Sequence, residues 1–328
     1  MAATNDNETS SLTSAESAIY SDLSASVTSS ILQGRFENGR RYHAHREGTY
    51  LLPEDEKEQD RLDLMGHCFN LVLKGDLHKA PLGANPQLCL DIGTGTGMWA
   101  LDFADKYPAC EVIGTDLSAI QPSWTSPNCR FIIDDANADW LFANQKGHFD
   151  FIHARYLYPG GIEDWDKLWR QAFDHLRPGG WVEHQEPTSM FFAADPAFEA
   201  VKGESQAWYW QECVNEASEK IGRNFNIAHE QKERMVKAGF VNVRQEVVDC
   251  PIGTWDKDQV ELGKVALLNV LEGIRPTCLA IFTRVLGWDL VRSEALTAAV
   301  LKEFLTSKYK LSFKLYFTYG QKPMSVAS

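Results

Sequence analysis

Short apolar runs alternate with longer amphipathic stretches through the middle of the chain. Five runs have the length of buried strands: QLCLDIG, CEVIGTDL, CRFIIDDA, HFDFIHAR and WVEHQEP. Between them, GMWALDFADKY and IEDWDKLWRQAFDHL carry apolar residues at helical spacing. Strands that alternate with helices are joined by right-handed crossovers. The pattern therefore predicts a doubly wound α/β core, whose mostly parallel sheet is covered on both faces.

Helical and strand patterns also flank this core. Residues 52–73 open with a proline and acidic turns and are expected to form an amphipathic helix, with apolar positions at Leu62, Met65, Phe69 and Val72. Residues 188–238 are predicted to be largely helical, and further helices are expected over roughly 256–308. The alternating segments GFVNVRQEVVDCPIG and LSFKLYFTYGQKP predict that strands complete the sheet.

The bulk composition excludes several classes of protein. A net charge of −13 would repel a phosphate backbone, so no nucleic-acid partner is expected. Seven cysteines without a CxxC pair indicate neither a disulfide framework nor a zinc cluster, and we interpret them as core residues in a reducing compartment. No apolar run approaches the roughly 20 residues of a membrane span, so no membrane partner is expected either.

The first 34 residues are rich in Ser and Thr and contain no Lys or Arg. Because so little apolar surface cannot offset the entropy of ordering, this segment is predicted to be a disordered tail. It also lacks the charged start and apolar stretch of a secretory signal. A cytoplasmic location is expected, with the nucleus left open.

The segment from 87 to 118 carries the strongest chemical signal. A strand ends in Asp91, glycines follow at Gly93, Gly95 and Gly97, and a helix begins directly afterwards. A turn without Cβ atoms lets backbone N–H groups approach a ligand closely. Asp116 ends the next strand, 19 residues after Gly97, where an acidic residue binds ribose hydroxyls. These features predict a nucleotide-type ligand.

Two ligand classes compete for this loop. The dinucleotide fingerprint GxGxxG requires Gly or Ala where this chain has Met98. The carboxylate of Asp91 would repel a pyrophosphate but would pair with an α-ammonium group. An NAD-dependent reductase is therefore the disfavoured alternative.

Five motifs occur in order along the core: DIGTGTG, TDLS, IIDDAN, HFDFIHAR and LRPGGWVEHQEP. Together they resemble the ordered motifs of class I S-adenosylmethionine-dependent methyltransferases over residues 87–187. More narrowly, RRYHAHREGTYLLPEDEKEQDRLDLMGH before the core and YGQKP after it resemble the fungal LaeA-like methyltransferases. The resemblance implies a Rossmann-like, seven-stranded sheet and S-adenosyl-L-methionine as the cofactor.

The resemblance also implies a role for each motif residue. The methionine moiety would be held by Asp91, Gly93, Thr94, Gly95 and Gly97. The ribose and adenine would be contacted by Asp116, Leu117, Asp135 and Ala136. The far wall of the cofactor cleft would be formed by His153 and Arg155. Alternatively, His153 bonds a backbone carbonyl and Arg155 pairs with a nearby acid.

On this basis the chain divides into five parts. They are a tail (1–34), an N-terminal lid and helix (35–85), the cofactor-binding core (86–187), a helical substrate cap (188–238) and the C-terminal part of the core (239–328).

The segment GRRYHAHREGTY, residues 39–50, is basic in an otherwise acidic chain. Two histidines are too few for a metal site, so no metal is expected, and acids resume too soon for a nucleic-acid arm. By resemblance, the segment folds over the cofactor cleft as part of a lid. Tyr50 is then expected to touch the cofactor, and Arg41 or Arg46 to pair with its carboxylate. Alternatively, the arginines only pin the segment onto an acidic core.

The end of the fifth predicted strand carries three ionisable residues. His184 and Glu186 should point the same way, because side chains alternate along a strand, and Glu183 the other way. A base here would help a hydroxyl or amine acceptor lose its proton, so His184 and Glu186 are the predicted catalytic residues. Alternatively, they bond the lid. Aromatic residues at 156, 158 and 208–210 suit either an apolar acceptor pocket or a helix-packing core.

These observations favour a methyltransferase that acts on a small-molecule acceptor, such as a fungal secondary metabolite, by O- or N-methylation. Two alternatives remain: a LaeA-like regulator of secondary metabolism that acts with a regulatory protein partner, and a methyltransferase fold that catalyses a different reaction.

Overall fold

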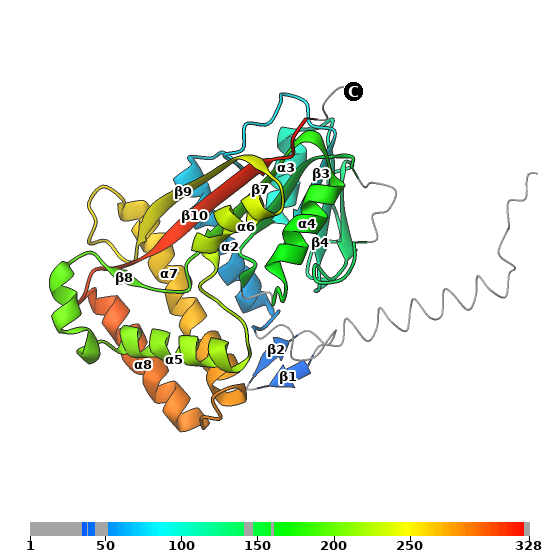
Figure 1. Cartoon of the computed structure of the whole chain (residues 1–328). Coiled ribbons are helices and arrows are strands. Elements are labelled where there is room, and N and C mark those ends of the chain that lie inside the picture. The colour runs from blue at the N-terminus through cyan, green and yellow to red at the C-terminus, as the bar shows by residue number, and fades with distance from the viewer. Residues whose placement is uncertain (1–34, 38, 43–51, 141–146, 159–160, 325–328) are drawn as a thin grey trace, which may run out of the picture.

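The computed structural model describes residues 35–37, 39–42, 52–140, 147–158 and 161–324 (Figure 1). The predicted tail at 1–34 lies outside this part of the chain. One large sheet runs through the centre of the described part. Its long strands are β3 (Leu88–Ile92), β4 (Glu111–Asp116), β5 (Cys129–Ile133), β6 (Phe149–Arg155), β7 (Leu176–Pro187), β9 (Val241–Pro251) and β10 (Leu311–Gln321).

The long strands lie in the order β5-β4-β3-β6-β7-β10-β9, and the short β8 (Phe192–Ala193) pairs with the start of β10. Neighbours from β5 to β7 are parallel, whereas β10 is antiparallel to β7 and β9. The predicted doubly wound, mostly parallel seven-stranded sheet is confirmed. The strand order reverses at β3, which lies between β4 and β6. Such a switch point leaves a crevice outside the carboxyl ends of the strands.

Helices cover both faces of the parallel part of the sheet. Leu90 of β3 belongs to a buried cluster with Trp169 of α4 (Trp165–His175) and Met235 of α6 (Gln231–Lys237). The preceding residue, Cys89, points to the opposite face of the sheet. It packs in a second cluster with Phe103 of α3 (Met98–Lys106). Alternate side chains of β3 therefore enter two different cores, as expected for a strand buried on both faces.

The remaining helices gather at one end of the sheet (Figure 1). They are α2 (Glu56–Leu73), α5 (Gln206–Lys220), α7 (Val260–Thr277) and α8 (Leu290–Thr306), with short 3₁₀ turns at Pro196–Ala200 and Lys202–Glu204. A third 3₁₀ turn, Ala228–Glu230, leads directly into α6. The end of α7 continues into a π-helix, Cys278–Phe282. A small antiparallel hairpin, β1 (Arg35–Glu37) and β2 (Arg40–Tyr42), lies apart from the large sheet.

The buried face of α2 differs from the predicted apolar stripe. Met65 and Phe69 are buried as expected, but Leu62 and Val72 are only half-buried. The buried positions also include two charged residues, Glu58 and Arg61. A charged pair on the buried face of a helix is costly unless each charge has a partner.

The helix from α7 through the π-helix, Val260–Phe282, is long and apolar enough to cross a membrane, with a mean hydropathy of 1.5. This corrects the expectation that no segment of the chain has this length and composition. In the fold, 61% of the most apolar 18-residue stretch of this helix is buried. Its side chains pack with those of α2, α5 and β10 in one core cluster. All seven cysteines are free and buried, as predicted.

Candidate functional site

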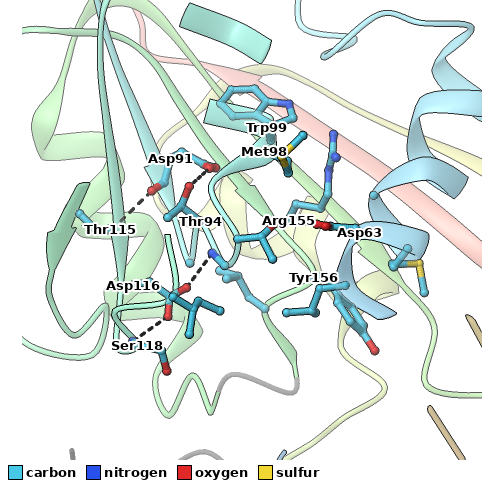
Figure 2. Close-up of a pocket in the computed structure, with 18 of the residues that line it drawn as sticks. Asp63, Asp91, Thr94, Met98, Trp99, Thr115, Asp116, Ser118, Arg155 and Tyr156 are labelled. Atoms are coloured by element: carbon cyan, nitrogen blue, oxygen red, sulfur yellow. Dashed lines mark hydrogen bonds between the residues drawn. The ribbon is translucent and has the colours of Figure 1, made fainter. Parts of the chain in front are cut away.

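A cavity of about 360 Å³ opens at the carboxyl ends of β3, β4 and β6, beside α2 (Figure 2). We call it the first cavity. Its lining includes most residues that the sequence predicted for the cofactor: Asp91, Gly93, Thr94, Gly95, Asp116, Leu117, Asp135, Ala136, His153 and Arg155. The topology thus brings together motifs that are separated by up to 64 residues in the chain.

The glycine loop after β3 has the conformation that its composition predicts. Gly93, Gly95 and Gly97 have φ values of 65°, 57° and 82°, which other residues rarely adopt. A Cβ atom at Gly93 would lie 2.4 Å from Leu157, and one at Gly97 would lie 2.5 Å from Phe131. Gly97 is not part of the described lining of the first cavity; it is the N-cap of α3 at the end of the loop. Glycine is therefore required for both backbone shape and space.

Asp91 and His153 lie at the same level of neighbouring parallel strands and face each other. His153 Nδ1 is 2.7 Å from Asp91 Oδ1, and Thr94 Oγ1 donates to Asp91 Oδ2 at 2.6 Å. The His153 ring stacks on Trp99 with centroids 3.6 Å apart. Burial lowers the pKa of His153 to about 4, although the Asp91 carboxylate opposes this shift. His153 is therefore a neutral residue that orients Asp91, and its partner is a side chain rather than a backbone carbonyl.

Asp116 connects the end of β4 to the glycine loop. Its two carboxylate oxygens accept the backbone N–H groups of Gly95 at 2.8 Å and Ser118 at 2.9 Å. Burial raises the pKa of Asp116, while these two N–H groups oppose the rise. Farther along, Asp135 lines the first cavity, and so does its neighbour Asp134, for which no role was predicted.

A second, smaller cavity of about 90 Å³ lies between α2, α7 and the end of β7. It shares three lining residues with the first cavity, namely Glu58, Met65 and Tyr156. The rest of its wall is mostly apolar and includes Leu52, Phe191, Trp210, Val214, Phe225, Val270, Ile274, Ile281 and Phe313. The two cavities therefore meet at a shared wall.

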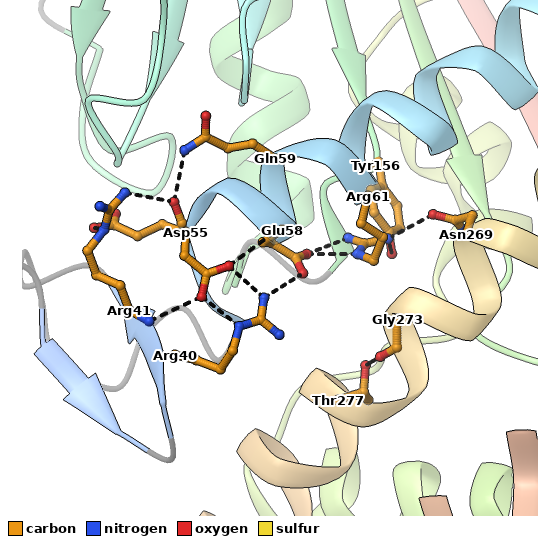
Figure 3. Close-up of polar contacts among 11 residues, drawn as sticks. Arg40, Arg41, Asp55, Glu58, Gln59, Arg61, Tyr156, Asn269, Gly273 and Thr277 are labelled. Atoms are coloured by element: carbon orange, nitrogen blue, oxygen red, sulfur yellow. Dashed lines mark hydrogen bonds and ion pairs between the residues drawn. The ribbon is translucent and has the colours of Figure 1, made fainter. Parts of the chain in front are cut away.

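A polar cluster stands at this shared wall (Figure 3). Arg61 donates to Glu58 Oε1 through Nε at 2.8 Å and through Nη2 at 2.6 Å. Its Nη1 donates to the Tyr156 hydroxyl at 3.3 Å and to Asn269 Oδ1 at 3.2 Å. Nearby, Arg40 binds both carboxylate oxygens of Asp55, the residue that caps the start of α2.

The predicted catalytic residues lie elsewhere. His184 and Glu186 do point the same way, with His184 Nε2 2.7 Å from Glu186 Oε2. Both are buried, His184 against the rings of Trp165 and Trp169, and neither lines either cavity as formed by the described residues. Glu186 accepts the backbone N–H of Leu157 at 2.9 Å. Their catalytic role stays a prediction without support from this geometry.

Glu183, on the opposite face of β7, has a structural partner. Its carboxylate accepts the backbone N–H groups of Lys79 and Ala80 and the side-chain amide of Gln185. Burial raises the pKa of Glu183 to about 7, while these donors oppose the rise. Glu183 therefore holds the segment between α2 and β3 against the sheet.

The basic segment is only partly described. Tyr50 and Arg46 lie outside the described residues, as do His43 and His45. Arg41 pairs with Glu54, which lines the first cavity, through Nε at 3.5 Å. Among the predicted aromatic residues, Tyr156, Tyr158 and Trp210 line the second cavity, whereas Trp208 and Tyr209 are not part of its described lining.

Sequence reasoning missed Trp99, which stacks on His153, and the pair Glu58 and Arg61. Trp99 occupies the first turn of the helix after the glycine loop, a position that gave no chemical signal. The buried pair did leave a signal, because Glu58 and Arg61 each lie four residues before an apolar position of the predicted helix, Leu62 and Met65.

A cavity at the switch point with a glycine loop on its wall is typical of nucleotide-binding α/β proteins. A methyltransferase domain model matches residues 43–245. The chain is 37% identical to the methyltransferase pytC of Aspergillus terreus over 301 residues, which cover 91% of each chain. It is also 36% identical over 265 residues to the secondary metabolism regulator LAE1 of Cochliobolus heterostrophus, covering 77% of this chain and 83% of the relative.

A third relative, the protein-methionine methyltransferase laeA of Emericella nidulans, is 35% identical over 296 residues, which cover 88% of this chain and 76% of the relative. The chain therefore belongs to the S-adenosylmethionine-dependent methyltransferases, and its relatives include both pytC and LaeA-family regulators of fungal secondary metabolism. The alternative of an NAD-dependent reductase is wrong.

Proposed function

We propose that this methyltransferase acts on a small molecule bound in the second cavity, next to a methyl donor bound in the first. The observation that carries this proposal is the shared wall of Glu58, Met65 and Tyr156. A transfer reaction requires donor and acceptor atoms to be held in contact and in line. Two adjoining cavities of different chemistry meet this requirement.

The residues of the first cavity fit the donor. S-adenosylmethionine supplies an electrophilic methyl group on a positively charged sulfur. Nine acidic residues line this cavity, namely Glu54, Glu58, Asp63, Asp76, Asp91, Asp102, Asp116, Asp134 and Asp135, against one arginine, Arg155. Such a lining favours a cationic ligand over a pyrophosphate.

Individual roles follow from this geometry. Asp116 would bind the ribose hydroxyls, with Leu117 and Ala136 against the adenine and Asp135 at its amino group. Asp91, oriented by Thr94 and His153, would face the α-ammonium group of the methionine moiety. The glycine loop would allow the backbone to approach the same moiety closely.

The small-molecule acceptor is favoured by the apolar lining of the second cavity and by the similarity to pytC. The alternative, a regulatory role with a protein acceptor or partner, is supported by the similarity to LAE1 and laeA. The cytoplasm remains our proposed location for either role.

The two roles can be separated by following a labelled methyl group. The protein would be incubated with S-adenosylmethionine that carries a tritiated methyl group and with either the metabolite or the protein fraction of an Aspergillus culture. We expect the label in an organic-solvent extract of the metabolite incubation. Label that is recovered only on precipitated protein would contradict the small-molecule proposal and favour the regulatory role.

A further inference from the structure

The Glu58–Arg61 pair is the most heavily buried ion pair at the shared wall. The Glu58 side chain is 1% exposed and the Arg61 side chain 4% exposed. Taking two charges out of water is costly and is often no more stabilising than apolar packing would be. A buried pair that borders two ligand cavities therefore calls for a role beyond stability.

Three uncommon backbone features surround this pair: a positive φ at Tyr156, a glycine of α7 packed against Arg61, and the π-helix. Tyr156, which accepts a hydrogen bond from Arg61, has a positive φ of 57°, a conformation that costs free energy for a tyrosine. Gly273 of α7 lies against Arg61, so that a Cβ atom there would be 3.3 Å from Arg61 Cδ. The π-helix places Ile281 in the same cavity wall. Such strained features concentrate at functional sites.

The charges of the cluster compensate each other. Arg61 gives two N–H groups to Glu58 Oε1, and Glu58 Oε2 lies 3.9 Å from Arg40 Nη2. An ammonium acceptor would need an uncompensated carboxylate, and an anionic acceptor an uncompensated cation. Neither is offered by the described lining of the second cavity. This wall therefore suits an acceptor that binds without a net charge.

Glu58 still has an oxygen available at the shared wall. The distance of 3.9 Å from Oε2 to Arg40 is too long for a hydrogen bond. Among the described residues, Glu58 is the one carboxylate that lines both cavities. It is therefore placed where the acceptor atom must meet the methyl group.

We propose, on the basis of the function proposed above, that the acceptor is a neutral hydroxyl compound with an apolar planar body, such as a phenol, and that Glu58 accepts its proton. The acceptor O–H bond breaks with its proton passing to Glu58 Oε2. The oxygen forms a bond to the methyl carbon, and the carbon–sulfur bond breaks with its electron pair left on sulfur. Arg61 is a positioning residue, which fixes Glu58 and the Tyr156 hydroxyl.

The first test measures the binding of 4-nitrophenol to the full chain saturated with S-adenosylhomocysteine. Calorimetry at several pH values would follow the affinity, and the absorbance of the phenolate would report which form is bound. We expect the affinity to fall about tenfold per pH unit above the pKa of free 4-nitrophenol, because only the neutral form binds. The absorbance should show loss of phenolate on binding.

The second test changes the charge at the shared wall. Glu58→Gln removes one negative charge from the shared wall, so that the phenolate is repelled less and the affinity should fall less steeply with pH than in the wild type. Glu261→Gln is the matched control, because it removes the same charge from the exposed surface of α7. If Glu58 has only a structural role, Glu58→Gln would lower the thermal stability of the protein. It would not change whether the neutral phenol or the phenolate binds.

The outcomes separate this proposal from the one on which it rests. Absence of S-adenosylhomocysteine binding would overturn the donor site and this proposal together. If S-adenosylhomocysteine binds normally, the proposed donor site is retained. The proposal of a neutral acceptor would then be contradicted if 4-nitrophenol does not bind, or if its affinity does not fall as the phenol ionises. Identical pH profiles in the wild type and Glu58→Gln would remove Glu58 from the acceptor site. If Glu58→Gln does not fold, the wild-type profile decides.

Discussion

The two cavities of this protein differ in how they are built. The first is made by the ends of parallel strands, the loops that follow them and one face of α2, and acidic side chains are prominent in its lining. The second is made by side chains from α2, β7, α5, α7 and β10, and its wall is mostly apolar. A constant donor needs fixed hydrogen-bonding partners, whereas an acceptor pocket can change by replacing side chains on helices.

Asp116→Ala should produce the largest effect on the first cavity. It removes the carboxylate that we place on the ribose and that also holds Gly95 N–H in the glycine loop. Hydrogen bonds to a charged group contribute about 1.5–3 kcal/mol each, so the loss of two should weaken S-adenosylmethionine binding about 100-fold or more. Calorimetric titration measures this change.

Asp139→Ala is a suitable control for Asp116→Ala, because Asp139 is exposed and lies outside both cavities. Its affinity for S-adenosylmethionine should match that of the wild type. Equal affinities in the two variants would show that Asp116 does not bind the donor.

Gly97→Ala should have an intermediate effect, because it strains the loop without removing a polar contact. The left-handed conformation costs a residue with a Cβ atom about 1–2 kcal/mol, and here the methyl group would also displace the Phe131 ring. We expect about tenfold weaker binding of S-adenosylmethionine. Gly75→Ala is the matched control, since Gly75 also has a positive φ but has open space around its Cα. Unchanged donor binding in Gly97→Ala would show that the loop shape is not needed.

The difference between the cavities also explains what could be predicted from the sequence. The glycine loop and Asp116 lie within 32 residues, and their spacing is set by a single strand–helix–strand unit. The fold and most of the first cavity followed from this unit and its neighbours. The roles of His184 and Glu186 were harder to predict. Alternation along β7 predicts which face of the sheet each side chain points to, but not which helices cover that face.

The second cavity could be predicted only in part, because most of its residues come together only in the folded chain. Glu58 and Asn269 are 211 residues apart in sequence, yet both contact Arg61. The positive φ of Tyr156 leaves no trace in composition, since tyrosine is not a residue that favours this conformation. Two local signals of this site were present: the charged residues on the predicted apolar face of α2, and the aromatic residues Tyr156, Tyr158 and Trp210, which suited either an acceptor pocket or a helix-packing core.

The most direct test of separate donor and acceptor cavities is Val270→Phe. The larger side chain would fill the second cavity from α7, and residue 270 does not line the first cavity. Two titrations of this variant, one with S-adenosylmethionine and one with 4-nitrophenol after saturation with S-adenosylhomocysteine, would compare the cavities in one molecule. A thermal unfolding curve would verify its fold, since overpacking costs about 1–3 kcal/mol. We predict donor affinity within about twofold of the wild type and loss of 4-nitrophenol binding by about tenfold or more. Loss of both affinities together, or of neither, would contradict the assignment of separate donor and acceptor cavities.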